Sequence, residues 1–135
     1  MHRPLGEHYI IELYGCNSNV LDNLEEITST LLESARIAGA TIIDHSFHRF
    51  SPQGVSGVVV IAESHLSIHT WPEYGYAALD LFTCNFDMDT DSVFKLLKHS
   101  FQPEDIDVRR LQRGILNSTV RSISQPGIAH RISVG

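Results

Sequence analysis

The chain has 135 residues, the length of one compact domain, and its 16 acidic residues outnumber its 10 basic residues to give a formal net charge of -6. This balance excludes the clustered cationic surface that binds a nucleic-acid backbone, and no stretch approaches the roughly 20 apolar residues that span a bilayer. From the charge and the hydrophobic pattern we expect a protein that binds neither nucleic acid nor membrane. Cys16 and Cys84 are too few and too far apart for a disulfide framework, so we expect this protein to be cytoplasmic.

The hydrophobic pattern predicts strands and helices in alternation. Asn19 and Asp22 would begin a first helix with an apolar stripe from Val20 to Ala38, and Gly39 would end it. The acidic run 87–91 would begin a second helix that includes Phe101. Runs rich in β-branched and aromatic residues predict strands at 6–14, 40–50, 55–62, 66–71, 75–84 and 106–111.

This order of elements predicts an α+β fold, a two-layer sandwich of a mostly antiparallel sheet with helices on one face. Residues 1–114 would form the domain. Residues 115–135 are dominated by Ser, Asn, Gly and Pro without periodicity, so we expect a flexible C-terminal tail there.

Polar side chains are concentrated at 63–73, which read Glu-Ser-His-Leu-Ser-Ile-His-Thr-Trp-Pro-Glu between strongly apolar runs. This segment resembles the processing motif of the short prokaryotic S-adenosylmethionine decarboxylase proenzymes. The resemblance extends over about residues 4–114 and includes Phe-Thr-Cys at 82–84 and Leu-Gln-Arg-Gly at 111–114. The remaining tail lies outside it.

The resemblance implies autocatalytic cleavage between Glu63 and Ser64, which would give a β chain of 1–63 and an α chain of 64–135. The Ser64 hydroxyl would attack the Glu63 carbonyl and form an ester. Loss of the Ser64 α-proton, elimination of the Glu63 carboxylate and hydrolysis would then leave a pyruvoyl group. His69 matches the base of this processing, a role that suits an imidazole, and Ser56 matches a supporting serine.

The resemblance also implies the chemistry of turnover. The pyruvoyl carbonyl derived from Ser64 would form a Schiff base with the substrate amine and act as the electron sink, so pyridoxal phosphate is not required. Cys84 matches the proton donor to the resulting carbanion. The products would be S-adenosyl 3-(methylsulfanyl)propylamine and CO2, and the former supplies aminopropyl groups for spermidine synthesis.

Substrate binding and assembly follow from the same resemblance, and we assign no metal ligands. Phe50 matches an aromatic residue that stacks on adenine, and Glu73 matches a carboxylate that binds the ribose hydroxyls. The family pattern implies a homodimer with sites at its interface. Ser64 and Cys84 would come from one protomer, and its partner would supply Phe50, Ser56, His69 and Glu73.

Three other functions remain open at this stage. A decarboxylase of arginine or ornithine would keep the fold and the pyruvoyl chemistry with a different pocket. An inactive homologue could serve as a binding partner, although the three reactive positions Ser64, His69 and Cys84 are all retained. A metal-dependent hydrolase would need a histidine ligand set, but His45 and His48 are three apart on a presumed strand and face opposite sides.

Overall fold

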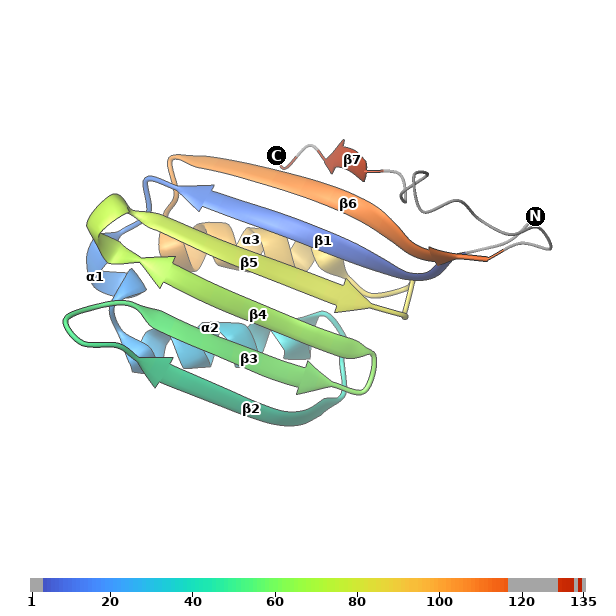
Figure 1. Cartoon of the computed structure of the whole chain (residues 1–135), viewed down its shortest axis with the longest axis horizontal. Coiled ribbons are helices and arrows are strands. Elements are labelled where there is room, and N and C mark those ends of the chain that lie inside the picture. The colour runs from blue at the N-terminus through green and yellow to red at the C-terminus, as the bar shows by residue number, and fades with distance from the viewer. Residues whose placement is uncertain (1–3, 117–128, 133, 135) are drawn as a thin grey trace.

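The computed structural model describes residues 4–116, 129–132 and 134. In chain order the elements are β1 (Pro4–Tyr14), α1 (Ser18–Leu21), α2 (Leu24–Ile37), β2 (Ile42–Arg49), β3 (Val55–Ile61), β4 (Ser64–Trp71), the 3-10 helix η1 (Pro72–Tyr74), β5 (Tyr76–Thr83), α3 (Thr90–Phe101), β6 (Asp105–Ile115) and β7 (Ala129–Ile132). The described strands form one sheet in the order β2-β3-β4-β5-β1-β6-β7, and every pairing is antiparallel. Helices α2 and α3 lie behind the sheet (Figure 1), which confirms the predicted α+β sandwich.

The two faces of the sheet differ because alternate side chains of each strand point to opposite sides. In β5, Ala77, Leu79 and Leu81 are buried toward the helices. The helices contribute a stripe of fully or nearly fully buried side chains, among them Ile27, Leu31, Val93, Phe94, Leu97 and Phe101. Burial of one such large side chain stabilises the fold by about 1.5–3 kcal/mol. We call the opposite side the open face, because no described helix covers it.

The first helical segment is divided, so the prediction of one helix that begins at Asn19 is wrong. Asn17 begins α1, where its side chain accepts from the backbone N–H groups of the next turn. Asn23 begins α2, and its Oδ1 accepts from the Glu26 N–H over 3.1 Å. An asparagine side chain competes with the helix for backbone donors and so favours a helix start over a helix interior. The predicted stop at Gly39 is confirmed by its φ of 85°.

The C-terminal strands extend beyond the prediction. β6 reaches Ile115 because it pairs along the whole of β1, from Tyr14↔Asp105 to Pro4↔Ile115. β7 then pairs with β6 between Leu111↔Ala129 and Val108↔Ile132. The prediction of a flexible tail over 115–135 is therefore wrong at 129–132, and its remainder at 117–128, 133 and 135 lies outside the described residues. None of the helices in the described ranges is long and apolar enough to cross a bilayer.

Candidate active site

Ser64 begins β4 directly after the two-residue turn Ala62-Glu63, and its backbone is strained. Its φ is 151°, one of two positive values among the non-glycine residues that the structure describes, the other belonging to Gln102 at the end of α3. A side chain held in such a conformation costs about 1–3 kcal/mol. A glycine at position 64 would relieve the strain but would carry no hydroxyl. The strain therefore lies at the bond that the motif predicts to be cut.

Glu63, the residue before Ser64, is held by hydrogen bonds to its main-chain carbonyl and to its side chain. Its carbonyl oxygen accepts a hydrogen bond from the Cys84 backbone N–H over 3.0 Å. Its side-chain Oε1 accepts from the Thr41 N–H over 3.1 Å. A backbone N–H aimed at a carbonyl oxygen stabilises the negative charge that develops there on nucleophilic attack. The carbonyl that Ser64 would attack is thus already polarised.

A pocket of about 500 Å³ joins Ser64 to Cys84, as the sequence analysis predicted for one protomer. The Cys84 side chain is exposed at this pocket, whereas Cys16 is buried. Burial raises the pKa of the Cys16 thiol to about 11, so Cys16 stays protonated and unreactive. The pocket is lined by Leu5, Ala62, Glu63, Ser64, Phe82, Cys84, Arg113 and Gly114.

Ser56 and His69 form a second group on neighbouring strands. They are directly opposite each other in the β3–β4 pairing, and Ser56 Oγ lies 2.8 Å from His69 Nδ1. The buried Thr70 fixes this end of the two strands, because its hydroxyl donates to the Leu21 carbonyl over 2.8 Å and accepts from the Val55 N–H over 2.9 Å. The predicted processing pair is therefore assembled within one chain.

The second group does not meet Ser64 in the same chain. His69 is five residues further along β4, which corresponds to about 17 Å of extended strand. Phe50 and Glu73 lie at the same end as His69, Phe50 directly after β2 and Glu73 in η1. Both side chains are exposed, and the Phe50 ring packs edge-on against His48 at 4.6 Å. The predicted site residues thus form two half-sites at opposite ends of the sheet.

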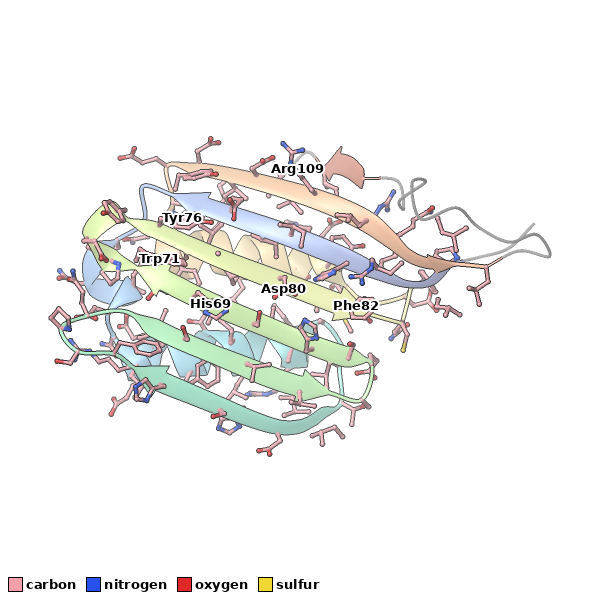
Figure 2. All side chains as sticks on the ribbon, in the orientation of Figure 1. His69, Trp71, Tyr76, Asp80, Phe82 and Arg109 are labelled. Carbon is pink, nitrogen blue, oxygen red and sulfur yellow. The ribbon has the colours of Figure 1, made fainter. Side chains whose placement is uncertain are left out.

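Between the two half-sites, Asp80 lies on the sheet at the level of β5 (Figure 2) and is the centre of a hydrogen-bonded network on the open face. Its Oδ2 lies 2.6 Å from His8 Nε2 on β1 and 2.9 Å from His65 Nε2 on β4. Its Oδ1 accepts from the Ser67 hydroxyl. Burial raises the pKa of Asp80, but the hydrogen bonds from Ser67, His8 and His65 together outweigh burial and hold that pKa below its usual value. Asp80 is therefore an ionised acceptor.

His8, His65 and Asp80 place one possible metal-ligand atom each within 4.8 Å of one another. The contact of Arg113 with His8 distinguishes a metal site from a hydrogen-bonded network. Its guanidinium can only donate, and it lies 2.8 Å from His8 Nδ1, so that nitrogen accepts and Nε2 carries the proton donated to Asp80. A protonated ring nitrogen has no lone pair for a metal. We therefore interpret the cluster as a hydrogen-bonded network.

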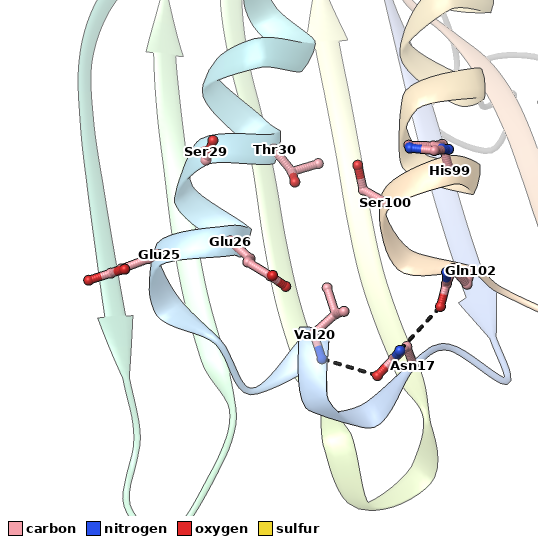
Figure 3. Close-up of a pocket in the computed structure, with 9 residues that line it drawn as sticks. All are labelled: Asn17, Val20, Glu25, Glu26, Ser29, Thr30, His99, Ser100 and Gln102. Atoms are coloured by element: carbon pink, nitrogen blue, oxygen red, sulfur yellow. Dashed lines mark hydrogen bonds between the residues drawn. The ribbon is translucent and has the colours of Figure 1, made fainter.

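A separate pocket of about 470 Å³ opens between α2 and α3 on the helix side of the molecule (Figure 3). It contains none of the site residues predicted from the sequence. It is lined by Asn17, Val20, Glu25, Glu26, Ser29, Thr30, His99, Ser100 and Gln102. The predicted site residues lie on strands or within two residues of a strand end, so we do not assign the active site to this pocket.

Sequence analysis missed the Asp80 network. It left His65 without a role and did not consider Asp80 or Arg113. One signal was present, because Asp80 is the only charged residue in the otherwise apolar and aromatic run 76–82. The partners His8 and Arg113 are 72 and 33 residues away along the chain, and only the strand order brings them together.

Comparison with known proteins identifies the family of the chain. The sequence profile of the S-adenosylmethionine decarboxylase family matches residues 7–114. The chain is 54% identical over 112 residues to the S-adenosylmethionine decarboxylase proenzyme of Thermosipho melanesiensis, covering 83% of this chain and 86% of that protein. It is 45% identical over 120 residues to the proenzyme of a Thermoanaerobacter species, covering 89% and 97%. The crystal structure of the adenosylmethionine decarboxylase from Aquifex aeolicus superposes with a TM-score of 0.79 at 33% identity, covering 89% and 99%. The chain therefore belongs to the S-adenosylmethionine decarboxylase family.

Proposed function

We propose that this protein cleaves itself between Glu63 and Ser64, forms a pyruvoyl group from Ser64, and decarboxylates S-adenosylmethionine. One observation carries the proposal. A strained serine follows a carbonyl that already accepts a hydrogen bond from the Cys84 N–H, within a chain of this family. Strain at the reacting residue lowers the barrier to its rearrangement, and the N–H stabilises the charge that attack creates.

Processing needs a nucleophile, a base and a leaving group, and the chain supplies all three. Ser64 Oγ attacks the Glu63 carbonyl carbon, and the amide bond becomes an ester with a free amine on Ser64. A base, for which we propose His69, removes the Ser64 α-proton. The Glu63 carboxylate then leaves with the ester electron pair, and the resulting dehydroalanine tautomerises to an imine. Addition of water and release of ammonia leave the ketone of the pyruvoyl group.

In turnover, the pyruvoyl group supplies a carbonyl that takes up the substrate amine and withdraws electrons as CO2 leaves. Cys84 lies in the same pocket as Ser64 and is exposed there, so its thiol is placed to return a proton to the substrate α-carbon. The product would be the decarboxylated nucleoside that donates aminopropyl groups in spermidine synthesis.

The half-site of Phe50 and Glu73 favours a nucleoside substrate. An exposed aromatic ring can stack on a flat base, and an ionised carboxylate accepts hydrogen bonds from ribose hydroxyls. Arginine and ornithine have neither a nucleobase nor ribose hydroxyls. The family match points the same way, so the alternative of a basic amino acid decarboxylase is not favoured.

We further propose that two protomers pack through their open faces in antiparallel orientation. The separation of the half-sites supports this, because a twofold axis near the middle of the face would bring Ser64 of one protomer to the Ser56 and His69 of the other. Charge supports it too. The guanidinium of Arg113 lies toward the Ser64 end of the open face, whereas the carboxylates of Glu12, Asp105 and Asp107 lie toward the His69 end. Antiparallel packing would place opposite charges together.

Intact-mass spectrometry of the purified protein tests the cleavage. We expect two chains, 1–63 and 64–135, the second with a blocked amino terminus whose mass fits a pyruvoyl group. Comparison of CO2 release from S-adenosylmethionine, arginine and ornithine then tests the substrate. A single full-length chain with no borohydride-reducible carbonyl would refute the processing, and turnover of arginine or ornithine alone would refute the substrate.

A further inference from the structure

Cleavage between Glu63 and Ser64, which is the proposed function on which this inference rests, has a structural consequence. It cuts the turn that joins β3 to β4, so Ser64 changes from the first residue after a tight turn to a free chain end. In the uncleaved chain Ser64 pairs with Ile61 on one side and with Thr83 on the other. Conversion to the pyruvoyl group removes the Ser64 nitrogen, so after cleavage residue 64 has no N–H for either neighbour. Terminal residues of strands fray, and here the terminal residue carries the reactive group.

Side chains tie the start of β4 to β5. His65 directly follows Ser64, and its Nε2 lies 2.9 Å from Asp80 Oδ2. Ser67 donates to the other oxygen of the same carboxylate. The His65 ring also packs edge-on against Phe82 at 5.9 Å. Two of the first four residues of β4 therefore bind to one carboxylate on the neighbouring strand.

Asp80 is itself held from the other side of β5. His8 on β1 approaches its Oδ2 to 2.6 Å, and Arg113 on β6 approaches His8 Nδ1 to 2.8 Å. The network thus spans β4, β5, β1 and β6. Arg113 also lies over the Phe82 ring at 5.3 Å, and both line the pocket of Ser64 and Cys84. The anchor of β4 therefore belongs to the central strands of the sheet and is connected to that pocket through Arg113 and Phe82.

We propose that Asp80 is a positioning residue that acts through His65, and that it holds the free end of β4 so that the group formed from Ser64 stays aligned with Cys84. Asp80 lies on the next strand and reaches Ser64 only through its neighbour. Misplacement of a reacting group by about 1 Å can cost about a hundredfold in rate. The bond to His65 opposes that displacement once the turn is cut.

Asp80→Ala, His65→Phe and the double variant test this proposal. The phenylalanine keeps a ring against Phe82 but has no N–H for Asp80. We expect each single variant to be cleaved and then to show kcat reduced about tenfold to a hundredfold with a smaller change in KM. Because both changes break the same bond, the double variant should be no slower than Asp80→Ala alone. His65→Gln, which retains a donor, should recover most of the lost kcat.

Hydrogen exchange gives a readout that does not depend on activity. In cleaved Asp80→Ala, the amides of 65–68 should exchange faster than in the cleaved parent. In the uncleavable Ser64→Ala background the intact turn still holds the strand, so adding Asp80→Ala should speed the exchange of these amides less than it does in the cleaved protein. Faster exchange to the same extent in both backgrounds would mean that Asp80 only stabilises the fold, and would overturn the proposal.

Asp89→Ala serves as the matched structural control. Asp89 begins α3 on the other face of the sheet, where its side chain accepts from Ser92. The positioning role would be contradicted if Asp89→Ala lost as much kcat as Asp80→Ala. It would also be contradicted by additive losses of kcat in the double variant of Asp80 and His65, or by a loss of kcat that follows dissociation of the oligomer. If Asp80→Ala fails to fold, the kcat values of His65→Phe and His65→Gln still test the positioning role. Absence of cleavage in the parent protein would instead refute the proposed function.

Discussion

The backbone N–H of Cys84 lies 3.0 Å from the carbonyl oxygen of Glu63, while the side chain of Cys84 opens into the pocket of Ser64. In the proposed function, one residue would therefore serve two steps through different atoms. The main chain would assist cleavage, and the thiol would assist turnover.

Replacement of Cys84 by alanine separates these two steps. Cys84→Ala keeps the N–H on Glu63, so we expect complete cleavage by intact mass. It removes the thiol, so kcat should fall about a hundredfold or more, the usual contribution of a proton donor. Cys16→Ala is the matched control and should leave kcat nearly unchanged. A Cys84→Ala protein that stays uncleaved would show that the thiol itself takes part in processing.

The strain at Ser64 predicts an inverted order of stability between alanine and glycine. Neither variant has a hydroxyl, so both should remain single chains. Glycine accepts the φ of 151° at position 64 without penalty, whereas alanine does not. Ser64→Gly should therefore be more stable than Ser64→Ala by about 1 kcal/mol, although glycine in a strand is normally the weaker residue. Urea unfolding of the two uncleaved proteins measures the difference, and equal stabilities would argue against strain.

Mixed dimers test the assembly of the two half-sites. Ser64→Ala and His69→Ala chains should each fail to cleave when expressed alone. When they are coexpressed, one site of the mixed dimer would combine an intact Ser64 with the partner subunit's intact His69. We therefore expect about half of the sites in mixed dimers to recover, with cleavage confined to the His69→Ala chain. Mass spectrometry identifies the cleaved chain, and a lack of any cleavage would place both residues in the site of a single protomer.

The two cysteines should differ in reactivity toward alkylating agents. Burial raises the pKa of Cys16 to about 11, so at pH 8 only about one molecule in a thousand has this thiolate. Cys84 is exposed. Iodoacetamide at pH 8 should modify Cys84 first and leave Cys16 intact in the folded protein. Peptide mapping checks the site, and preferential labelling of Cys16 would show that the buried segment opens readily.

Asp80 should contribute a pH-dependent part of the stability. Its pKa in the folded protein is held below the unfolded value of about 3.9, so its stabilisation is present above that pH and is lost as the pH falls through the folded pKa. In the uncleavable Ser64→Ala background, Asp80→Asn should lower Tm at pH 6. The difference from the parent should shrink below about pH 4. A constant difference between pH 6 and pH 3 would contradict this assignment.

The sequence by itself determined the elements and the reactive motif. Local patterns were sufficient for the main strands and for α3, because alternation and apolar stripes depend on near neighbours. Those patterns failed at Asn23, where a side chain competes with the helix, and at β7, whose partner strand is distant along the chain. The roles predicted for Ser64, His69 and Cys84 rest on the family resemblance of the motif at 63–73 and of Phe-Thr-Cys at 82–84.

Only the tertiary structure decided how these residues are grouped. It separates Ser64 from His69 along one strand, and it places the Cys84 N–H on the carbonyl of Glu63. It also assembles Asp80 with His8 and Arg113 from three strands, which no local pattern encodes. The physical reason is strand order. β1 pairs between β5 and β6, so hydrogen-bond partners are set by registers between residues up to 111 positions apart, as in Pro4↔Ile115.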